Sequence, residues 1–142
     1  MKYTCEIEIK QPVDKTVELF LNQENLFKWL PGLQKLELIE GEKGKPGAKT
    51  KLHFDMDGKK IEMIETLHKE NLPEEFAVTF EAKGVVNIQT TRFEKIDENK
   101  TRYVSENEFQ FKGFMKLMTL MPGAFKKQSM KYLESFKKFA EG

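Results

Sequence analysis

The chain has one cysteine, two histidines and no long apolar run, and each shortage excludes a class of structure. Because Cys5 stands alone, no disulfide can form within the chain. His53 and His68 have no partner at the spacing that zinc sites use, so we expect no metal site and no cofactor. No segment approaches the length of a membrane span, and the N-terminus lacks an apolar signal segment. We therefore expect a cytoplasmic protein without integral membrane contact.

The chain also lacks an excess of charge of either sign, since 24 basic and 23 acidic side chains leave a formal net charge of +1. A nucleic-acid-binding domain usually carries a clear basic excess, so nucleic acid is not an expected partner. The charge is unevenly distributed, because residues 112–142 hold seven lysines and two glutamates. We interpret this basic segment as the solvated face of a helix, with contact to an anionic membrane surface as the alternative. Its lysines include Lys126, Lys127, Lys131, Lys137 and Lys138.

Phenylalanine is abundant, with 12 among 142 residues, and these large side chains supply much of the apolar volume. The hydrophobic fraction of 39% and the charged fraction of 33% are those of a globular protein. This length suits one domain with a sizeable core, and we expect residues 1–142 to form a single domain.

Alternation of apolar and polar residues predicts strands over most of the chain. The first strand covers residues 3–9. Two short helices are expected next, one from Pro12 to about Asn22 and the other at residues 23–29. Six further strands occupy residues 33–112 in hairpin-length pieces, and Asp57-Gly58 is a strong two-residue turn between two of them.

A long helix is expected at residues 113–140, where apolar side chains recur at helical spacing. Proline in a helix interior removes a hydrogen bond and clashes with the preceding turn. Pro122-Gly123 therefore predicts a kink, or a short helix followed by a longer one. The complete order of elements predicts an α+β fold, in which a curved seven-stranded antiparallel sheet wraps around the long C-terminal helix.

Four segments stand in a characteristic order and spacing: residues 11–17 (QPVDKTV), 26–33 (LFKWLPGL), 91–94 with 100–102 (TRFE and KTR), and 125–128 (FKKQ). Together with the element order, they resemble the START-like or SRPBCC superfamily, which includes the birch pollen allergen and polyketide cyclase/dehydrase-type proteins. The resemblance covers nearly the whole chain and implies the helix-grip fold, with a cavity between the sheet and the long helix. Members bind lipids, sterols, polyketides and hormones, and a minority catalyse cyclisation or dehydration. The resemblance thus implies a pocket and no particular reaction.

Two neighbouring strands predict a polar strip inside such a pocket. If Phe93 points inward on one strand, and Phe109 and Phe111 do so on the next, alternation places several polar side chains on the same face. A packed core avoids unpaired polar groups, which cost about 1–3 kcal/mol each, so the strip indicates water or ligand inside. The alternative orientation of the first strand buries Val86 and Ile88 instead. The polar residues are Asn87, Gln89, Thr91, Tyr103, Ser105 and Asn107.

Other candidate lining residues come from neighbouring strands and from the C-terminal segment. Glu65 shares its strand face with Met63 and Leu67. Methionines of the C-terminal segment suit an adaptable binding wall, with ordinary core packing as the alternative. Trp29 is either a lid contact at the cavity mouth or an anchor for the following turn. The complete predicted ligand-binding set is Phe54, Glu65, Phe80, Asn87, Gln89, Thr91, Tyr103, Ser105, Asn107, Met118, Met121 and Phe125.

The function favoured by these observations is the binding of a small hydrophobic molecule, such as a lipid, a polyketide or an aromatic metabolite, by a carrier or sensor. One alternative is a cyclase or dehydratase-type enzyme, with Glu65 as the acid or base and Tyr103 as a hydrogen-bond donor. Another is a protein-interaction module. No catalytic residue is assigned, and the sequence leaves the ligand and the oligomeric state open.

Overall fold

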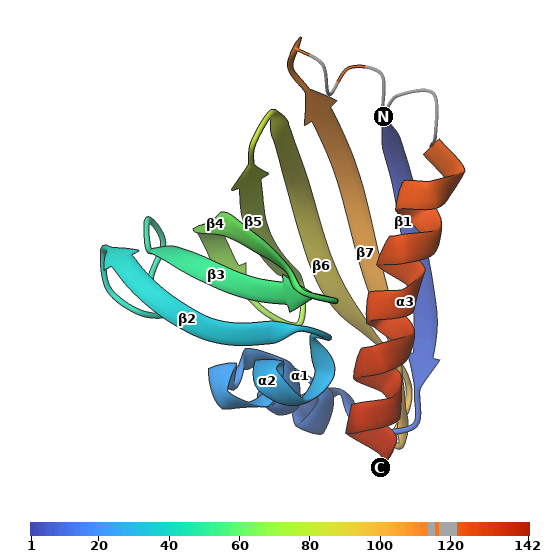
Figure 1. The fold of residues 1–142 in the computed structure, drawn as a ribbon. Coiled ribbons are helices and arrows are strands. Elements are labelled where there is room, and N and C mark those ends of the chain that lie inside the picture. Colours follow the sequence, from blue (N-terminus) through green and yellow to red (C-terminus); the bar gives the residue numbers. More distant parts are fainter. Residues whose placement is uncertain (114–115, 117–121) are drawn as a thin grey trace.

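The computed structural model describes residues 1–113, 116 and 122–142, and its elements follow the predicted order (Figure 1). Strand β1 (Lys2–Ile9) leads into helix α1 (Val13–Leu21), the 3-10 turn η1 (Gln23–Asn25) and helix α2 (Leu26–Trp29). Six strands follow, and helix α3 (Pro122–Glu141) ends the chain. The strands are β2 (Leu33–Glu40), β3 (Lys49–Met56), β4 (Lys59–Asn71), β5 (Glu75–Ala82), β6 (Val85–Asp97) and β7 (Lys100–Phe111).

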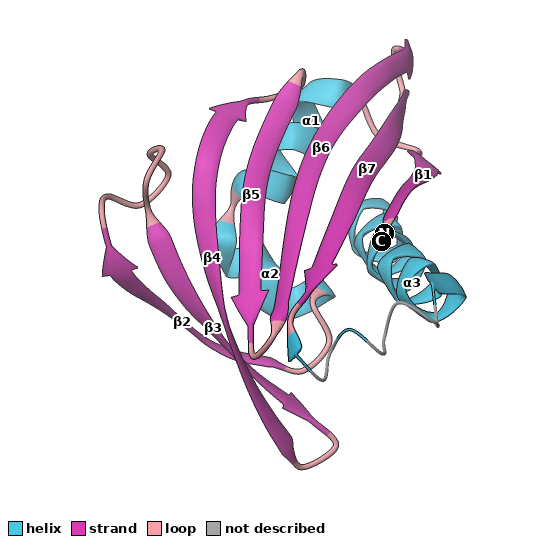
Figure 2. Cartoon of the chain, turned by 90° about the horizontal axis from the view of Figure 1, so that it is seen from above, coloured by secondary structure: helices cyan, strands magenta, loops and turns pink. Residues whose placement is uncertain are grey.

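The seven strands form one antiparallel sheet in the order β1-β7-β6-β5-β4-β3-β2. From β2 to β7, each strand forms a hairpin with the next strand in the chain. Strand β1 pairs with β7 and forms the edge of the sheet opposite to β2. The sheet is strongly curved, and α3 lies along its β1 side (Figures 1 and 2). Helix α1 contacts β6 and β7, and α2 contacts α3 and β2. The predicted α+β helix-grip fold, with its seven-stranded sheet and long C-terminal helix, is confirmed.

The larger core cluster lies where α3 meets β1, β6, β7 and the two short helices. Phe136 of α3 is fully buried at its centre. Its ring centroid lies between 5.1 and 6.3 Å from those of Phe20, Trp29, Phe93 and Tyr103. A second, smaller cluster is centred on β2 and β3. These two clusters hold the two ends of the curved sheet.

Several bounds differ from the sequence prediction, and proline explains two of the differences. Pro12 has extended backbone angles (φ −58°, ψ 152°) and precedes α1, so it is not the first helical residue. Pro122 is the first residue of α3, where its missing N–H is harmless. The prediction at Pro122-Gly123 was a kink, or a short helix followed by a longer one, and the residues before Pro122 that decide between them lie outside the described residues. The second short helix is divided into η1 and α2. Residues 114–115 and 117–121 of the predicted C-terminal helix lie outside the described residues.

The turn between α2 and β2 depends on Gly32, which has a φ of +84°. A Cβ atom at this position would lie 2.7 Å from the carbonyl oxygen of Asp55 and 2.7 Å from the sulfur of Met56. We expect Gly32→Ala to lower the free energy of unfolding by about 2–4 kcal/mol, because it adds a clash to the backbone strain.

Gly58, in the β3–β4 turn, is the matched control, since its φ is +89° and a Cβ there would meet nothing within 4 Å. Gly58→Ala carries the strain alone, and should cost about 1–2 kcal/mol. Urea unfolding of the two variants measures the difference. Equal losses of unfolding free energy in the two variants would contradict the expectation that a clash adds to the strain at Gly32.

Candidate functional site

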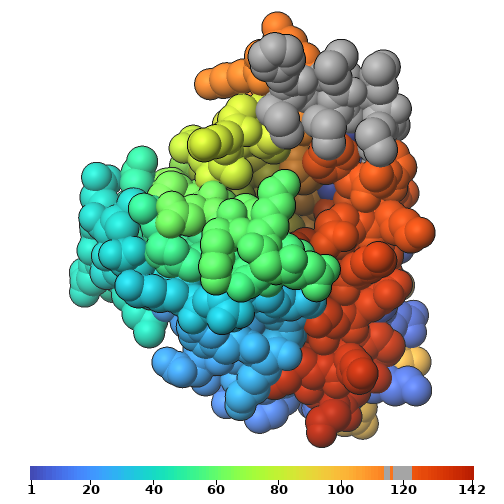
Figure 3. Space-filling view, viewed as in Figure 1, coloured from blue at the N-terminus to red at the C-terminus, as the bar shows by residue number. Residues whose placement is uncertain are grey.

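A cavity of about 540 Å³ lies between the sheet, the two short helices and α3. On the face drawn in Figure 3, the surface is hollowed between the β3–β4 strands, in green, and α3, in orange and red. Strands β3 to β7 contribute residues to the wall by alternation, and α3 contributes residues one turn apart. Most of the wall is apolar, and its aromatic side chains are Phe20, Trp29, Phe54, Phe76, Phe80, Tyr103, Phe109, Phe125 and Tyr132.

The structure brings most of the predicted ligand-binding residues together on this wall. Ser105 is fully buried directly behind it. Met118 and Met121 lie outside the described residues. On strand β6 the polar side chains face the cavity and Ile88 faces outward, because Thr91 is 2% exposed while Ile88 is 36% exposed. The wall includes Phe54, Glu65, Phe80, Asn87, Gln89, Thr91, Tyr103, Asn107 and Phe125 from the predicted set.

Several wall residues were absent from the prediction, although the sequence held a signal for some of them. Thr50 and Phe54 are four positions apart on β3, and so are Phe76 and Phe80 on β5. Since side chains of a strand alternate between its two faces, each pair lies on one face. The wall residues of α1 and α2 carried no such signal, because only the packing of these helices onto the sheet brings them to the cavity. The wall residues absent from the prediction include Phe20, Leu26 and Leu30 on α1 and α2, and Gln128, Ser129 and Tyr132 on α3.

The polar strip on β6 and β7 largely satisfies its own hydrogen bonds. The Asn87 amide donates to Oδ1 of Asn107 and to the carbonyl oxygen of Glu108, each at 3.3 Å. The Asn107 amide donates to Oγ of Ser105 at 3.0 Å, and the Gln89 amide donates to the same oxygen at 3.1 Å. Asn107 also donates to the carbonyl oxygen of Ser105. The side-chain oxygens of Asn87 and Gln89 accept no hydrogen bond from the described residues and remain available as acceptors.

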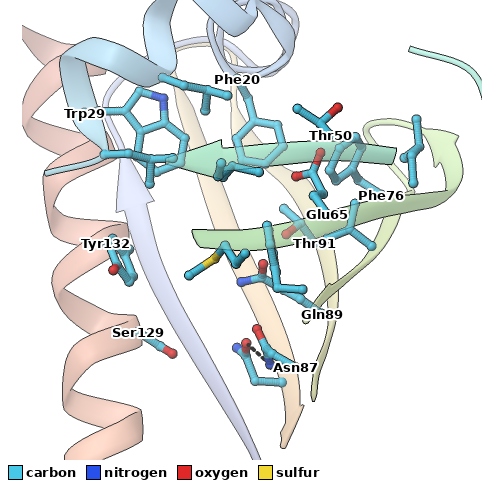
Figure 4. Close-up of a pocket in the computed structure, with 18 of the residues that line it drawn as sticks. Phe20, Trp29, Thr50, Glu65, Phe76, Asn87, Gln89, Thr91, Ser129 and Tyr132 are labelled. Carbon is cyan, nitrogen blue, oxygen red and sulfur yellow. Dashed lines mark hydrogen bonds between the residues drawn. The ribbon is translucent and has the colours of Figure 1, made fainter. Parts of the chain in front are cut away.

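Glu65 contrasts with this strip. It lies on β4 between its cross-strand neighbours Thr50 on β3 and Phe80 on β5. Figure 4 shows its carboxylate on the cavity side, among Thr50, Phe76 and Thr91. Within the described part of the chain, no side chain or backbone group forms a hydrogen bond or ion pair with it. Burial away from bulk water raises the pKa of this carboxyl from 4.5 to about 7.

Trp29 and Tyr103 mark the end of the cavity beside the larger core cluster. Trp29 is 6% exposed, packs against Phe20 and Phe136, and accepts a hydrogen bond from Oγ of Ser135 at its carbonyl oxygen. This buried position corresponds to the anchoring role. The indole N–H has no partner among the described residues. Burial strongly raises the pKa of Tyr103, whose side chain therefore stays a neutral phenol.

The ionisable groups that give the described cavity wall its charge are acidic. Glu65 and Glu70 line the cavity, and no lysine, arginine or histidine among the described residues does so. Across residues 1–113, 116 and 122–142, no group of three His, Cys, Asp or Glu side chains is placed to hold a metal ion. Among the helices of the same ranges, none is long and apolar enough to span a membrane.

Comparison with known proteins gives a family and a set of similar folds. A family model described as polyketide cyclase / dehydrase and lipid transport matches residues 1–141. The structure is similar to Ara h 8.0201, with 17% identity, a TM-score of 0.79 and coverage of 99% of this chain and 97% of that one. It is also similar to the Zhui aromatase/cyclase from Streptomyces sp. R1128, with 15% identity, a TM-score of 0.80 and coverage of 99% and 93%. No curated protein matches the chain by sequence.

A third similar structure is a START superfamily protein from Mycobacterium smegmatis, with 11% identity and a TM-score of 0.74. The match covers 96% of this chain and 97% of that one. At these identities the solved structures show a shared fold, and a fold of this kind hosts several functions.

Proposed function

We propose, from the premise that this chain belongs to the polyketide cyclase/dehydrase and lipid-transport family, that it binds one small hydrophobic molecule as a carrier or sensor. The START-like resemblance seen in the sequence is confirmed by this membership and by the similar folds. The observation that carries the proposal is the cavity of about 540 Å³ with its largely apolar wall. Ligand pockets of about 300–1,000 Å³ with a few polar groups are typical of small-molecule sites.

The cavity leaves part of the protein interior unfilled. Protein interiors are normally filled to the density of organic crystals, and an apolar space of this size forfeits many dispersion contacts. A hydrophobic ligand restores those contacts and removes its own apolar surface from water, which contributes about 25 cal/mol per Å². The aromatic side chains of three strands and three helices meet around this space, so a chain-like or ring-containing ligand can contact them together.

Dye binding tests the proposal, with N-phenyl-1-naphthylamine as a neutral apolar fluorescent probe. Ala82 of β5 lines the cavity, and Ala82→Phe fills part of it. Ala77 lies on the opposite face of the same strand, so Ala77→Phe is the matched control. We expect the wild type and Ala77→Phe to bind the dye, and Ala82→Phe to bind it about tenfold or more weakly. A wild-type protein that binds neither this dye nor any apolar compound would overturn the proposal.

A second candidate function, catalysis of the cyclase or dehydratase kind, is favoured by one observation. The pKa of Glu65, raised to about 7, lets its carboxyl both give and take a proton near neutral pH. The Tyr103 phenol lies on the same wall as a hydrogen-bond donor. In that case Glu65→Gln should abolish turnover of a poly-β-ketone substrate, measured by mass spectrometry, while the variant still binds the dye.

A further inference from the structure

We propose that the ligand of this cavity is a hydrophobic molecule with a protonated amine, whose ammonium group pairs with the Glu65 carboxylate. This inference rests on the proposed function and names the chemical class of the ligand. It excludes fatty acids and other apolar anions as the preferred ligands.

The carboxylate of Glu65 has no partner in the described part of the chain. Buried carboxylates are normally paired or hydrogen-bonded, because an isolated one loses its hydration without compensation. The neighbouring polar residues follow this rule, as Asn87, Gln89, Ser105 and Asn107 bond to one another. Glu65 alone among these inward-facing polar residues has strong acceptor atoms, a charge and no partner in the described chain. A bound donor would supply that partner.

The charge on the wall favours a cation as this donor. Glu65 and Glu70 are the acidic residues lining the cavity, and the described wall contains no cationic side chain. Lys49 and Lys51 lie on the opposite face of β3, where Lys51 pairs with Glu62 on β4. The lysines of the loop between β2 and β3, Lys43 and Lys45, are exposed. A recess lined by carboxylates, with low-dielectric aromatic walls, focuses a negative potential and attracts cations.

The groups around Glu65 match the needs of an ammonium ion, which has three donors and no acceptor. Thr50, the cross-strand neighbour of Glu65, has a hydroxyl that can accept a second hydrogen bond. The Thr91 hydroxyl lies on the same side of the cavity (Figure 4). Phe76 and Phe80 place aromatic rings beside this carboxylate, and aromatic faces attract cations. The rest of the wall accommodates the apolar part of the ligand.

The ionisation of Glu65 gives the proposal a pH signature. Its pKa of about 7 reflects desolvation alone, with no charged group resolved as a cause. The other titratable groups on the wall are Glu70 of β4, Tyr103 of β7 and Tyr132 of α3, while the wall residues of β3, β5, β6, α1 and α2 are not titratable. A protonated amine pairs with the ionised carboxylate, so its affinity should rise as the pH increases through 7 and level off above it. A carboxylate ligand would show the opposite trend.

The experiment is displacement of N-phenyl-1-naphthylamine by three probes of equal chain length: decylamine, decan-1-ol and decanoate. In the wild type at about pH 8, we expect decylamine to bind about tenfold or more tightly than decan-1-ol, and decanoate to bind most weakly. At about pH 5.5 the advantage of the amine should fall by about tenfold or more. Glu65→Gln keeps the size of the side chain, and should remove both the amine preference and its pH dependence.

The matched control is Glu62→Gln, on the same strand but on the outer face, where the Glu62 side chain is 58% exposed. This variant should retain the wild-type preference. Equal affinities of amine and alcohol in the wild type, an amine preference that survives in Glu65→Gln, or tighter binding of decanoate would each overturn this inference. All three results leave the proposed function intact, whereas failure of the wild type to bind the dye and any of the probes overturns that function itself. The wild-type pH dependence tests the inference without any variant.

Discussion

Phe136→Ala is expected to lower the free energy of unfolding by about 3–5 kcal/mol, the loss usual for removing a fully buried aromatic ring. Phe136 has no exposed surface, and its ring contacts four other aromatic rings from α1, α2, β6 and β7. Truncation leaves a void that these rings cannot fill without moving away from their other packing partners. Because domains of this size are stable by only about 5–15 kcal/mol, the loss is a large part of the total. Urea unfolding followed by circular dichroism measures it.

Phe27→Ala is the control for this prediction, since Phe27 lies on the neighbouring helix α2 and is 43% exposed. Its truncation should cost less than about 1 kcal/mol. A loss of the same small size in Phe136→Ala would mean that α3 is held to the sheet by other contacts. Phe136 lies behind the cavity wall and is absent from the cavity lining, so the test concerns the scaffold and not ligand contact.

Glu65→Gln is expected to stabilise the protein above neutral pH, by up to about 3 kcal/mol. The folded state holds the pKa of Glu65 at about 7, against an ordinary value of 4.5, so the folded state binds the proton more tightly than the unfolded state does. The sign follows from linkage: below about pH 4.5 both states are protonated and burial of this carboxyl carries no ionisation penalty. Stability is then lost as the pH rises from 4.5 through 7, and the loss is complete above it. A carboxyl pKa raised from 4.5 to about 7 corresponds to about 3 kcal/mol.

The measurement is the difference in unfolding free energy between Glu65→Gln and the wild type at two pH values. At about pH 8 the variant should be more stable by about 3 kcal/mol, and at about pH 5.5 by about 1 kcal/mol. Taking the difference cancels the contribution of other carboxyl groups whose pKa is lowered, such as Glu94 and Asp55, because they are present in both proteins. A difference that does not change with pH would show that Glu65 is ionised normally in the folded protein.

Phe136 and Glu65 affect the stability of the domain in opposite directions. Phe136 stabilises the scaffold, whereas the ionised form of Glu65 weakens it. A residue that costs stability where no neighbour compensates for it is typical of a functional position. A bound amine, the ligand class that we infer for this cavity, supplies the missing compensation and links ligand binding to stability near neutral pH.

Much of the sheet could be predicted from alternation alone, because side chains of a strand face opposite sides with a period of two. The β6 strand is an example: placing Phe93 inward placed Asn87, Gln89 and Thr91 inward as well, and the structure has that orientation. Asp57-Gly58 also followed from local chemistry, since both residues adopt the positive φ values that a tight hairpin turn requires. The family resemblance then predicted how these pieces fold together.

The bounds of α3 illustrate what local rules leave open. A proline next to a glycine is compatible with a kink, a break or a helix start, and these differ only in what precedes the proline. The sequence allowed a kink, or a short helix followed by a longer one, and the structure has α3 beginning at Pro122. The wall residues from α1 and α2 were open for a similar reason, since helical periodicity identifies an apolar face but not the surface that it meets.

The sequence by itself determined the strands of this protein and which polar side chains share one face of β6 and of β7, because both follow from residues close together in the chain. It left open which face of β6 is buried, and the structure decided this. Only the tertiary structure decided which of those polar groups are free. Asn87 meets Asn107, and Gln89 meets Ser105, because β6 and β7 pair in one register, and these contacts join residues far apart in the chain. Glu65 has no such neighbour because its own cross-strand neighbours are Thr50 and Phe80, whose side chains leave its charge uncompensated. Hydrogen-bond partners are a property of register and packing, and single-strand patterns do not contain them.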